Sequence, residues 1–542
     1  MSSSSRPPPR WSHICALADI LPDCGVAALL NGEQVAVFRV RDALHAIGNR
    51  DPASGANVLA RGIVGDVGGE IVVASPIYKQ HFSLVTGHCL EEPSVSVPVY
   101  LVRVIEDQVW VRGEAVMLRR PAHKPRLVVI GNGMAARGTL EELLELASGA
   151  YEITVCDAEP EPRGYNRILL SPLLAGEKGV DDIVTHPPEW YTQRGIALQS
   201  GDPIVHIDRV HRRVRSARGV ETSYDRLLMA TGSLPLRLSV AGSDLPGVMT
   251  FRELRDVQRM LEAAQTGQRA IVIGGGLLGL EAAEGLRRRG MEVTVIHLAG
   301  HLLERQLDAQ AAALLQRELE ARGLRFILHA TTTAILGSDR VAGIRLADGR
   351  QLPADLIVMA VGVRPNIKLA QAAGLRCDQG VLVDDTLLTY DPAIYAVGEC
   401  VQHRDRTFGL VAPLWAQARV CAAHLVERGA RRYGGSMPST HLKVSGIEVF
   451  SAGDCSASER SESLVLRDAR RGVYKRVILE NNKVVGAVLY GDTREGSWLF
   501  GLINEGRDIA SCRDRLLFGG ATDGAGPGSA RTGGSGGGAV LQ

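Results

Sequence analysis

The chain has 542 residues, with 61 Lys and Arg against 60 Asp and Glu, and a formal net charge of +1. This length predicts three or four domains. The balanced charge excludes the basic footprint of a nucleic-acid-binding protein or of one that binds anionic membranes. A hydrophobic content of 45% excludes a largely disordered chain, and no apolar run reaches the roughly 18 residues of a membrane span. Glycine, at 61 residues, is enriched and belongs either to linkers or to phosphate-binding loops.

The nine cysteines include no C-x-x-C pair. Their spacing argues against a clustered zinc or iron–sulfur site, so no bound metal is expected. The odd count and the lack of an apolar leader fit a reducing compartment, and a cytoplasmic location is expected. Residues 1–12 are polar and Pro-rich and are predicted to form a disordered lead.

Short β-branched runs separated by turn residues fill residues 13–112. Runs such as EIVVAS and VPVYLVRV predict a small all-β domain. Residues 113–125 contain two prolines and a basic cluster and are predicted to be a linker. The next 300 residues alternate strands with amphipathic helices, a pattern typical of a parallel α/β fold.

A glycine loop follows the first strand of this α/β region. The buried-type strand 126–130 runs into Gly131 and Gly133, in a G-x-G-x-x-A pattern that opens a helix. The first glycine permits the tight turn, and the second lets the backbone approach a pyrophosphate at the helix N-terminus. Glu159, after the next strand, is placed to hold a ribose hydroxyl. A single loop of this kind is also compatible with an ordinary tight β–α turn.

The pattern occurs again 143 residues later, at Gly274, Gly276 and Gly279, followed by Glu281. Two such loops imply two dinucleotides. The following strand ends at His297, where an acid would favour NAD and an arginine cluster would favour NADP. Because no arginine occupies this position, NADH is the preferred reading and NADPH stays open; His297 is equally compatible with a polar strand end that has no recognition role.

Two further segments complete a familiar layout: a strand ending at Thr231 and Gly232, and an AVGE segment ending at Gly398 and Glu399. The order of these motifs resembles the two-dinucleotide-binding-domain flavoproteins, in which an NAD(P)H domain interrupts an FAD domain. The resemblance implies an FAD domain at 126–250 and 355–430 and an NAD(P)H domain at 251–354. Related proteins usually carry Asp at the position of Glu399.

The resemblance also implies which residues bind each dinucleotide. FAD would be bound by Gly131, Gly133, Met134, Ala135, Glu159, Arg167, Ser171, Ile204, Thr231, Gly232, Gly398, Glu399 and Trp415. NAD(P)H would be bound by Gly274, Gly276, Leu278, Gly279, Glu281, His297 and Gly362. No protein side chain is assigned a catalytic role, because the flavin carries the chemistry.

Three segments narrow the resemblance: YNRILLSP from Tyr165, ERQLD from Glu304 and VGECVQH from Val397. They resemble the flavin portion of the large subunit of assimilatory NAD(P)H nitrite reductase and the electron-transfer subunit of assimilatory nitrate reductase. This implies that Trp415 lies near the isoalloxazine ring, although a core aromatic is an equal alternative. Related reductases often carry LSK where this chain has LSP, so the resemblance does not imply a lysine beside the flavin. Residues 431–515 are expected to form an α+β cap, and 516–542 a flexible tail whose AVLQ ending resembles a viral protease site.

The N-terminal domain contains DPASG from Asp51 and SPIYKQHF from Ser75. These segments resemble the two loops of a Rieske domain, whose cluster needs two cysteines and two histidines. The corresponding positions are Asp51, Ala53, Ser75 and Tyr78. We therefore expect the cluster-free form found in the nitrite reductase small subunit, acting as a docking or scaffolding module. His81 is taken as a structural residue.

The resulting hypothesis is an NADH-dependent FAD electron-transfer subunit. Its expected partner is the molybdenum-containing catalytic subunit of assimilatory nitrate reductase, with a nitrite reductase second; no nucleic acid or membrane is expected to bind. One alternative is an NADH:ferredoxin or rubredoxin-type reductase, and another is a non-catalytic flavin-binding scaffold or redox sensor. The acceptor, the oligomeric state, the choice between NADH and NADPH and the native C-terminus stay open.

Overall fold

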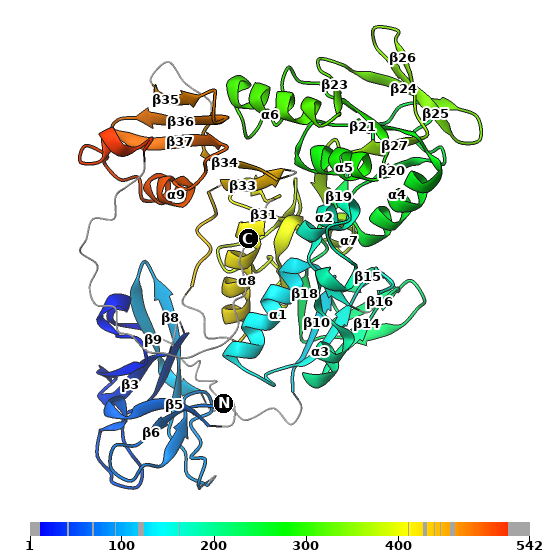
Figure 1. Cartoon of the computed structure of the whole chain (residues 1–542). Coiled ribbons are helices and arrows are strands. Elements are labelled where there is room, and N and C mark those ends of the chain that lie inside the picture. The colour runs from blue at the N-terminus through cyan, green and yellow to red at the C-terminus, as the bar shows by residue number, and fades with distance from the viewer. Residues whose placement is uncertain are drawn as a thin grey trace. The chain divides into compact units, whose positions relative to one another are not determined.

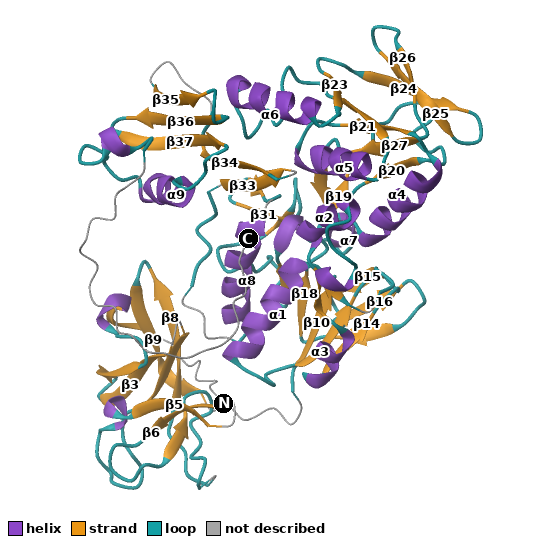
Figure 2. Cartoon of the chain, viewed as in Figure 1, coloured by secondary structure: helices purple, strands orange, loops and turns teal. Residues whose placement is uncertain are grey.

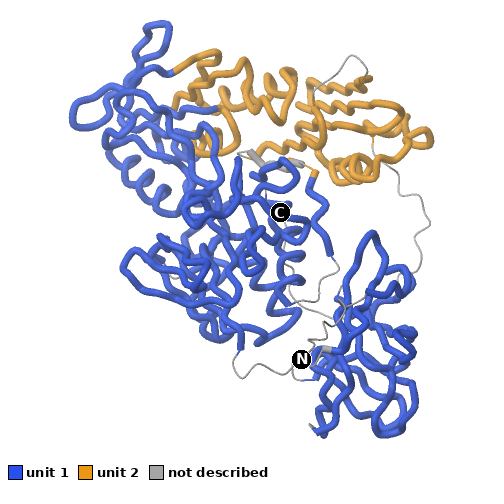
Figure 3. The backbone as a smooth tube through the Cα atoms, turned by 180° about the vertical axis from the view of Figure 1, so that it is seen from behind, with its two compact units in different colours: residues 1–274, 285–292, 332–436 blue, residues 275–284, 293–331, 437–542 orange. Residues whose placement is uncertain are grey.

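A computed structural model describes residues 11–518, apart from 41–42, 68–69, 93, 117–123, 162, 410, 427–430, 438, 445 and 456–460. The chain divides into two compact units, shown in Figure 3. Unit 1 comprises residues 1–274, 285–292 and 332–436, and unit 2 comprises residues 275–284, 293–331 and 437–542. The boundary directly after Gly274 lies inside the second glycine loop. No helix among the described residues is long and apolar enough to cross a membrane.

The N-terminal part of unit 1 is the expected all-β domain, coloured blue in Figure 1. One antiparallel sheet has the order β1-β9-β8-β4-β3-β2, and a smaller one has the order β5-β6-β7. The bounds of these strands are β1 Trp11–Ala16, β2 Cys24–Leu30, β3 Glu33–Val40, β4 Ala43–Gly48, β5 Ile63–Val67, β6 Glu70–Ala74, β7 His81–Ser83, β8 Val99–Ile105 and β9 Gln108–Val116. Because β1 starts at Trp11 and β9 ends at Val116, the domain is longer at both ends than 13–112.

Strand β3 shows why this sequence folds as a sheet. Successive side chains of a strand point to opposite faces. Val35 and Val37 accordingly pack in one hydrophobic cluster, and Ala36 and Phe38 pack in another. Both faces of the strand are therefore covered, and its apolar run is nearly continuous.

The FAD-type part of unit 1 is a parallel sheet in the order β14-β11-β10-β18-β30. Its strands are β10 Arg126–Ile130, β11 Glu152–Cys156, β14 Ile196–Gln199, β18 Arg226–Met229 and β30 Ile394–Ala396. Helices α1 (Met134–Leu146) and α8 (Val411–Leu425) pack against each other. Strand order reverses at β10, since β11 lies on one side and β18 on the other. Ligands of such sheets bind at the carboxyl ends of the strands at this switch point, which is where Gly131 follows β10.

Several of the remaining elements of this part are labelled in Figure 2. The helices are α2 Leu170–Ala175, α3 Pro188–Gln193 and α7 Lys368–Ala372. The strands are β12 Gly164–Tyr165, β13 Val184–His186, β15 Ile204–Asp208, β16 Arg213–Ser216, β17 Glu221–Ser223, β19 Ser233–Pro235, β28 Val363–Pro365, β29 Val381–Leu382, β31 Val401–His403 and β32 Arg406–Thr407.

Unit 1 also contains a second parallel arrangement, β20-β27-β21. Its elements are β20 Val248–Thr250, β21 Arg269–Ile273, β27 Leu356–Met359 and α4 Leu254–Thr266, with an antiparallel group β24 Thr332–Gly337, β25 Val341–Leu346 and β26 Gln351–Pro353. The prediction that the FAD domain resumes at 355 is wrong, because the fully buried β27 pairs with β20 and β21. The later strand β28 pairs with β19 of the FAD-type part.

Unit 2 contains the strand pair β22 (Glu292–Ile296) and β23 (Arg325–Ile327) and helix α6 (Ala309–Ala321). Helix α5 (Leu277–Arg288) has residues in both units. The C-terminal sheet has the order β33-β34-β37-β36-β35 and is covered by helix α9. The bounds are β33 Ser439–Val444, β34 Ile447–Gly453, β35 Glu462–Asp468, β36 Val473–Glu480, β37 Lys483–Tyr490 and α9 Gly496–Glu505.

The expected α+β cap at 431–515 is thus present with shifted ends. Tyr433 is 2% exposed and belongs to the core of the FAD-type part, while Leu516 is 1% exposed and belongs to the core of the cap. The cap therefore begins after Tyr433 and extends to at least Leu516, because these two buried side chains belong to different cores. The expected tail from 519 onward lies outside the described residues.

Candidate functional site

The first glycine loop connects β10 to α1. Gly131 has a φ of +98°, and a Cβ there would lie 2.4 Å from the carbonyl oxygen of Ala230, so this turn requires glycine. Gly133 is the N-cap of α1 with a φ of −72°, and a Cβ there would meet no described atom within 4 Å. The two glycines therefore differ: Gly131 is confined by the fold, and Gly133 leaves open space above the helix N-terminus.

Two buried polar side chains, Asn132 and Arg137, lie beside this loop. Asn132 is 5% exposed; its Oδ1 accepts a hydrogen bond from the Tyr191 hydroxyl at 2.8 Å, but its Nδ2 has no partner among the described residues. Arg137 is 4% exposed and donates to the carbonyl oxygens of Asn132 and Tyr165 at 3.1 and 2.7 Å. Burial lowers the pKa of its guanidinium. A buried donor, a buried cation and a helix N-terminus fit the pyrophosphate of a dinucleotide.

Neither Asn132 nor Arg137 was a predicted site residue. The signal for Asn132 is its place between the two loop glycines. The signal for Arg137 is weaker: it is a charged residue in the first turn of the helix that follows the loop, directly after the small residues Ala135 and Ala136.

The predicted ribose-binding acid lies after β11 and is held firmly. Glu159 accepts hydrogen bonds from the Tyr165 hydroxyl at 2.7 Å and from the Arg167 guanidinium. The structure therefore brings together Glu159 and Arg167, two predicted FAD residues. Asp157 lies on the same turn, and burial together with the negative charge of Glu159 raises the pKa of its carboxyl to about 6.

The two C-terminal segments of the predicted FAD site meet other parts of the fold. The Thr231 hydroxyl donates to the Asn366 carbonyl at 2.8 Å, and the Asn366 amide N–H donates to the Gly232 carbonyl at 2.9 Å. Gly398 has a φ of +89° and packs on α1, since a Cβ there would lie 2.8 Å from the Cβ of Ala135. Its N–H donates to the Gln417 side-chain oxygen at 2.7 Å. Two predicted FAD segments, around Ala135 and Gly398, thus lie side by side.

Glu399 takes the place of the aspartate that related flavoproteins carry. Its carboxylate accepts a hydrogen bond from the Ser233 hydroxyl at 2.7 Å and forms an ion pair with Arg252. Both members of that pair are largely buried, at 14% and 15% side-chain exposure. Arg252 was not predicted, because its partner lies 147 residues away in sequence.

The other predicted FAD residues are more dispersed. Met134 begins α1, Ser171 lies in α2, and Ile204 begins β15 and packs against the FAD-type core. Trp415 is 38% exposed, so it is not the buried core aromatic of the alternative reading. Its ring lies against α1, where a Cβ on Gly138 would be 2.5 Å from the ring.

The second glycine loop has the same local geometry at its first glycine and at a later one. In unit 1, Gly274 has a φ of +120°, and a Cβ there would lie 2.2 Å from the Ala360 carbonyl oxygen. Gly362, with a φ of +110°, accepts a hydrogen bond from the Leu236 N–H. In unit 2, a Cβ on Gly276 would meet no described atom within 4 Å. Leu278, Gly279 and Glu281 follow in helix α5, with Leu278 exposed and Gly279 buried.

His297, predicted to contact NAD(P)H, is 6% exposed and turned toward the loop. Its Nδ1 accepts a hydrogen bond from the Gly275 N–H at 3.0 Å, and its Nε2 lies 3.1 Å from the Glu304 carboxylate. The side chain therefore orients the loop backbone from within unit 2.

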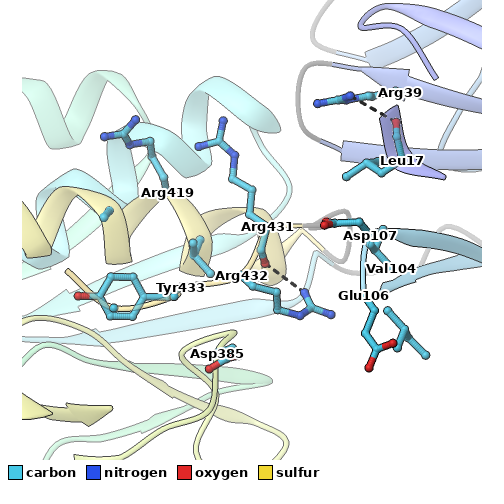
Figure 4. A pocket seen from close by; sticks show the side chains of 15 residues that line it. Leu17, Arg39, Val104, Glu106, Asp107, Asp385, Arg419, Arg431, Arg432 and Tyr433 are labelled. Carbon is cyan, nitrogen blue, oxygen red and sulfur yellow. Dashed lines mark hydrogen bonds between the residues drawn. The ribbon is translucent and has the colours of Figure 1, made fainter. Parts of the chain in front are cut away.

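Charged side chains also gather elsewhere in unit 1, as Figure 4 shows. A pocket there is lined by Arg419, Arg431, Arg432 and Asp385, among others, and by none of the predicted dinucleotide-binding residues. Asp385 pairs with Arg404 and His403. This pocket is distinct from the glycine loops.

The two Rieske-type loops of the N-terminal domain close on themselves. Asp51 and Ser75 are both 0% exposed, and the Ser75 hydroxyl donates to the Asp51 carboxylate. That carboxylate also accepts from the N–H groups of Ala53 and Ser54, at 2.8 and 3.3 Å. Tyr78 is 62% exposed. Carboxylate, methyl, hydroxyl and phenol groups do not fit a cluster that needs two thiolates and two imidazoles. His81 pairs with Glu91, which agrees with a structural role.

Residues 125–423 match the family of pyridine nucleotide-disulphide oxidoreductases. The chain belongs to this family. Residues 10–112 match the Rieske-like [2Fe-2S] domain, and residues 438–507 match the C-terminal domain of rubredoxin NAD+ reductase. These matches confirm the predicted fold class: a Rieske-like β domain, a two-dinucleotide flavoprotein fold and a small C-terminal domain. Membership in the family implies FAD and NAD(P)H.

The chain is 47% identical to the nitrite reductase [NAD(P)H] of Bacillus subtilis, over 71% of this chain and 48% of the relative. It is 44% identical to the assimilatory nitrate reductase electron transfer subunit of the same organism, over 73% of this chain and 51% of the relative. The chain thus spans about half the length of these curated relatives. Among solved structures, the ferredoxin reductase for the CYP199A2 system of Rhodopseudomonas palustris is 28% identical, with a TM-score of 0.62, over 68% of this chain and 91% of that one. The predicted resemblance is confirmed.

Proposed function

We propose that this protein is an NADH-dependent FAD electron-transfer subunit that supplies electrons to a separate catalytic subunit. The observation that carries the proposal is the matched geometry of the two glycine loops. In each, the first glycine is confined beneath a carbonyl oxygen and a later glycine faces open space. This is the arrangement that a dinucleotide pyrophosphate needs at a helix N-terminus.

The residues of unit 1 would hold FAD in defined ways. The open backbone at Gly133 and the Asn132 amide would face the pyrophosphate, and Glu159, fixed by Tyr165 and Arg167, would accept a ribose hydroxyl. Gly398 and Glu399 would lie along the remainder of the cofactor. When bound, FAD supplies two-electron oxidation of NADH and one-electron delivery to an acceptor. The protein binds and orients, and no side chain is assigned as nucleophile or base.

For the acceptor, we propose the molybdenum-containing catalytic subunit of assimilatory nitrate reductase, with a nitrite reductase as second choice. The proposal is supported by the names of the two Bacillus subtilis relatives, one of which is itself an electron transfer subunit. We further propose that the protein acts in the cytoplasm and that the Rieske-like domain carries no cluster and serves as a docking module. An NADH:ferredoxin reductase is the second candidate function, favoured by the likeness to the ferredoxin reductase structure.

The test is anaerobic mixing of the purified protein with NADH. We expect bound flavin that bleaches on mixing and regains its colour when nitrate reductase catalytic subunit and nitrate are added. Absence of flavin, or flavin that NADH does not bleach, contradicts the proposal and favours the scaffold reading. Reoxidation by a ferredoxin but by neither reductase favours the second candidate function. Stoichiometric iron and acid-labile sulfide would overturn the cluster-free assignment of the N-terminal domain.

A further inference from the structure

The strand end that normally selects between NADH and NADPH carries a histidine in this chain. In dinucleotide-binding folds an acid about 20 residues after the loop accepts a hydrogen bond from the adenosine 2′-hydroxyl. His297 follows β22, 21 residues after Gly276. A buried imidazole whose two nitrogens both have partners cannot itself replace that acid.

The tautomer of His297 follows from its neighbours. Nδ1 accepts a hydrogen bond from the Gly275 N–H, so it carries no proton. The neutral ring therefore has its proton on Nε2, which donates to Glu304 Oε2 at 3.1 Å. One ring thus links the backbone of the glycine loop to a carboxylate.

Glu304 has the properties that the missing acid needs. Its side chain is 42% exposed, whereas that of His297 is 8% exposed, so the carboxylate and not the ring reaches solvent beside the loop. One oxygen is held by His297, and the other accepts no hydrogen bond from any described residue. The backbone just before Glu304 is tied to the glycine loop, because the Leu303 N–H donates to the Gly275 carbonyl at 3.1 Å.

We propose that Glu304, positioned by His297, is the acid that accepts the 2′-hydroxyl of the adenosine ribose and excludes a 2′-phosphate. Glu304 determines specificity for NADH, and His297 is a positioning residue that acts through it. The inference rests on the proposed function, since it assumes that the second loop binds a nicotinamide dinucleotide. On this assignment a 2′-phosphate would face the Glu304 carboxylate, and the two negative charges would repel each other. The neighbouring Arg305 makes no hydrogen bond or ion pair with the loop among the described residues and is the competing determinant.

Equilibrium binding to the full-length holoprotein tests this directly. The probes are ADP-ribose, the same molecule lacking the adenosine 2′-hydroxyl, and 2′-phospho-ADP-ribose, measured by calorimetry. A hydrogen bond to a charged acceptor corresponds to roughly a 10- to 100-fold change in affinity. We expect the unmodified protein to prefer ADP-ribose over both analogues by at least about 10-fold. In Glu304→Ala the preference over the deoxy analogue falls to within about twofold, and the 2′-phospho compound binds more tightly than before.

Three variants make the result specific. Glu304→Asp should keep part of the preference, because the carboxylate is retained one methylene short. Glu320→Ala, which removes an exposed carboxylate of α6 in the same unit, should change no affinity. As a single variant, His297→Gln should reduce the preference for the 2′-hydroxyl. Combined with Glu304→Ala it should reduce that preference little further, since both substitutions act on one contact.

The failures are distinguishable. If NADH does not bleach the flavin and ADP-ribose does not bind, the proposed function itself is contradicted. If NADH bleaches the flavin but Glu304→Ala leaves the preference for the 2′-hydroxyl unchanged, the assignment of Glu304 is overturned. Tighter binding of 2′-phospho-ADP-ribose by the unmodified protein, lost in Arg305→Gln, would overturn it in favour of an NADPH site.

Discussion

The two Rieske-type loops and the first glycine loop differ in how their buried polar groups are satisfied. In related proteins, loops of both kinds bind a prosthetic group. Around Asp51 and Ser75 the buried polar groups satisfy one another, so the turn is complete without a ligand. Around Gly133 a buried amide of Asn132 has no described partner, and a Cβ would meet open space. Since leaving a buried donor unsatisfied costs free energy, a ligand that accepts a hydrogen bond from the Asn132 amide would be favoured here.

The pKa values of two carboxyl groups, Asp51 and Asp157, differ in the same way between the two regions. Burial alone would raise the pKa of Asp51, but hydrogen bonds from Ser75, Ala53 and Ser54 bring that pKa below its usual range. Burial and the charge of Glu159 raise the pKa of Asp157 to about 6. The Asp51 carboxylate is stabilised by hydrogen bonds within its own domain, whereas burial and the charge of Glu159 disfavour the ionised form of Asp157. The closed region should therefore depend on internal contacts, and the open region on its cofactor.

The largest expected effect is on FAD binding. Gly133→Val should lower FAD affinity by at least about 100-fold, because the side chain fills the open approach to the helix N-terminus. The φ of −72° is one that valine can adopt, and exchanging a favourable N-cap glycine for valine should destabilise the flavin-free protein by only about 1 kcal/mol. Flavin content after dialysis and circular dichroism measure the two properties.

The matched control is the neighbouring glycine. Gly131→Ala places a Cβ 2.4 Å from the Ala230 carbonyl at a φ of +98° and should destabilise the fold itself by about 2 kcal/mol, with or without FAD. Full flavin retention in Gly133→Val would show that the open space is not the cofactor site and would remove the contrast between the regions.

The next effect concerns the closed region. Asp51→Ala removes the acceptor of the Ser75 hydroxyl and of two backbone N–H groups, and should destabilise the N-terminal domain by about 2–3 kcal/mol. Chemical unfolding followed by tryptophan fluorescence measures the loss. Tyr78→Ala, at an exposed position of the same loops, should change stability by less than about 0.5 kcal/mol. Flavin reduction by NADH should be unaffected in both variants, and equal stability of the two would refute the closed network.

Sequence patterns predicted those parts of the molecule in which neighbouring residues carry the information. The confinement of Gly131 and Gly274 and the openness of Gly133 and Gly276 follow from spacing alone, because the loop and its helix are contiguous. The alternation along β3 likewise follows from period two.

Contacts between distant segments could not be predicted. Arg252 meets Glu399 across 147 residues, and His297 reaches Gly275 only because the strand after the loop returns beside it. The predicted domain limits at 355 and 431 differ from those of the structure for the same reason. β27 pairs with β21, and Tyr433 packs in the core of the FAD-type part. Periodicity in a single sequence does not identify which core a buried residue joins.

The smallest expected effect is a difference in how the stability of Asp157 and Asp51 variants depends on pH. The raised pKa of Asp157 means that the folded protein binds more protons than the unfolded chain between about pH 4 and pH 6. This group's contribution to stability is therefore present below pH 4 and is lost as the pH rises to about 6. Asp157→Asn should stabilise the flavin-free protein by about 1–2 kcal/mol at pH 7.5, and by almost nothing at pH 4.

Asp51 has the opposite sign, because its pKa is lowered. Its contribution is present above the ordinary aspartate pKa and is lost as the pH falls, so Asp51→Asn should be most harmful near neutrality and least harmful in acid. Urea unfolding checks the pair, with Asp157→Asn measured at about pH 4 and pH 7.5 and Asp51→Asn measured near neutrality and well below the ordinary aspartate pKa of 3.8. Parallel pH dependences in the two variants would mean that the two turns hold their carboxylates in the same way, whereas opposite dependences would show that hydrogen bonds favour ionised Asp51 and that burial disfavours ionised Asp157.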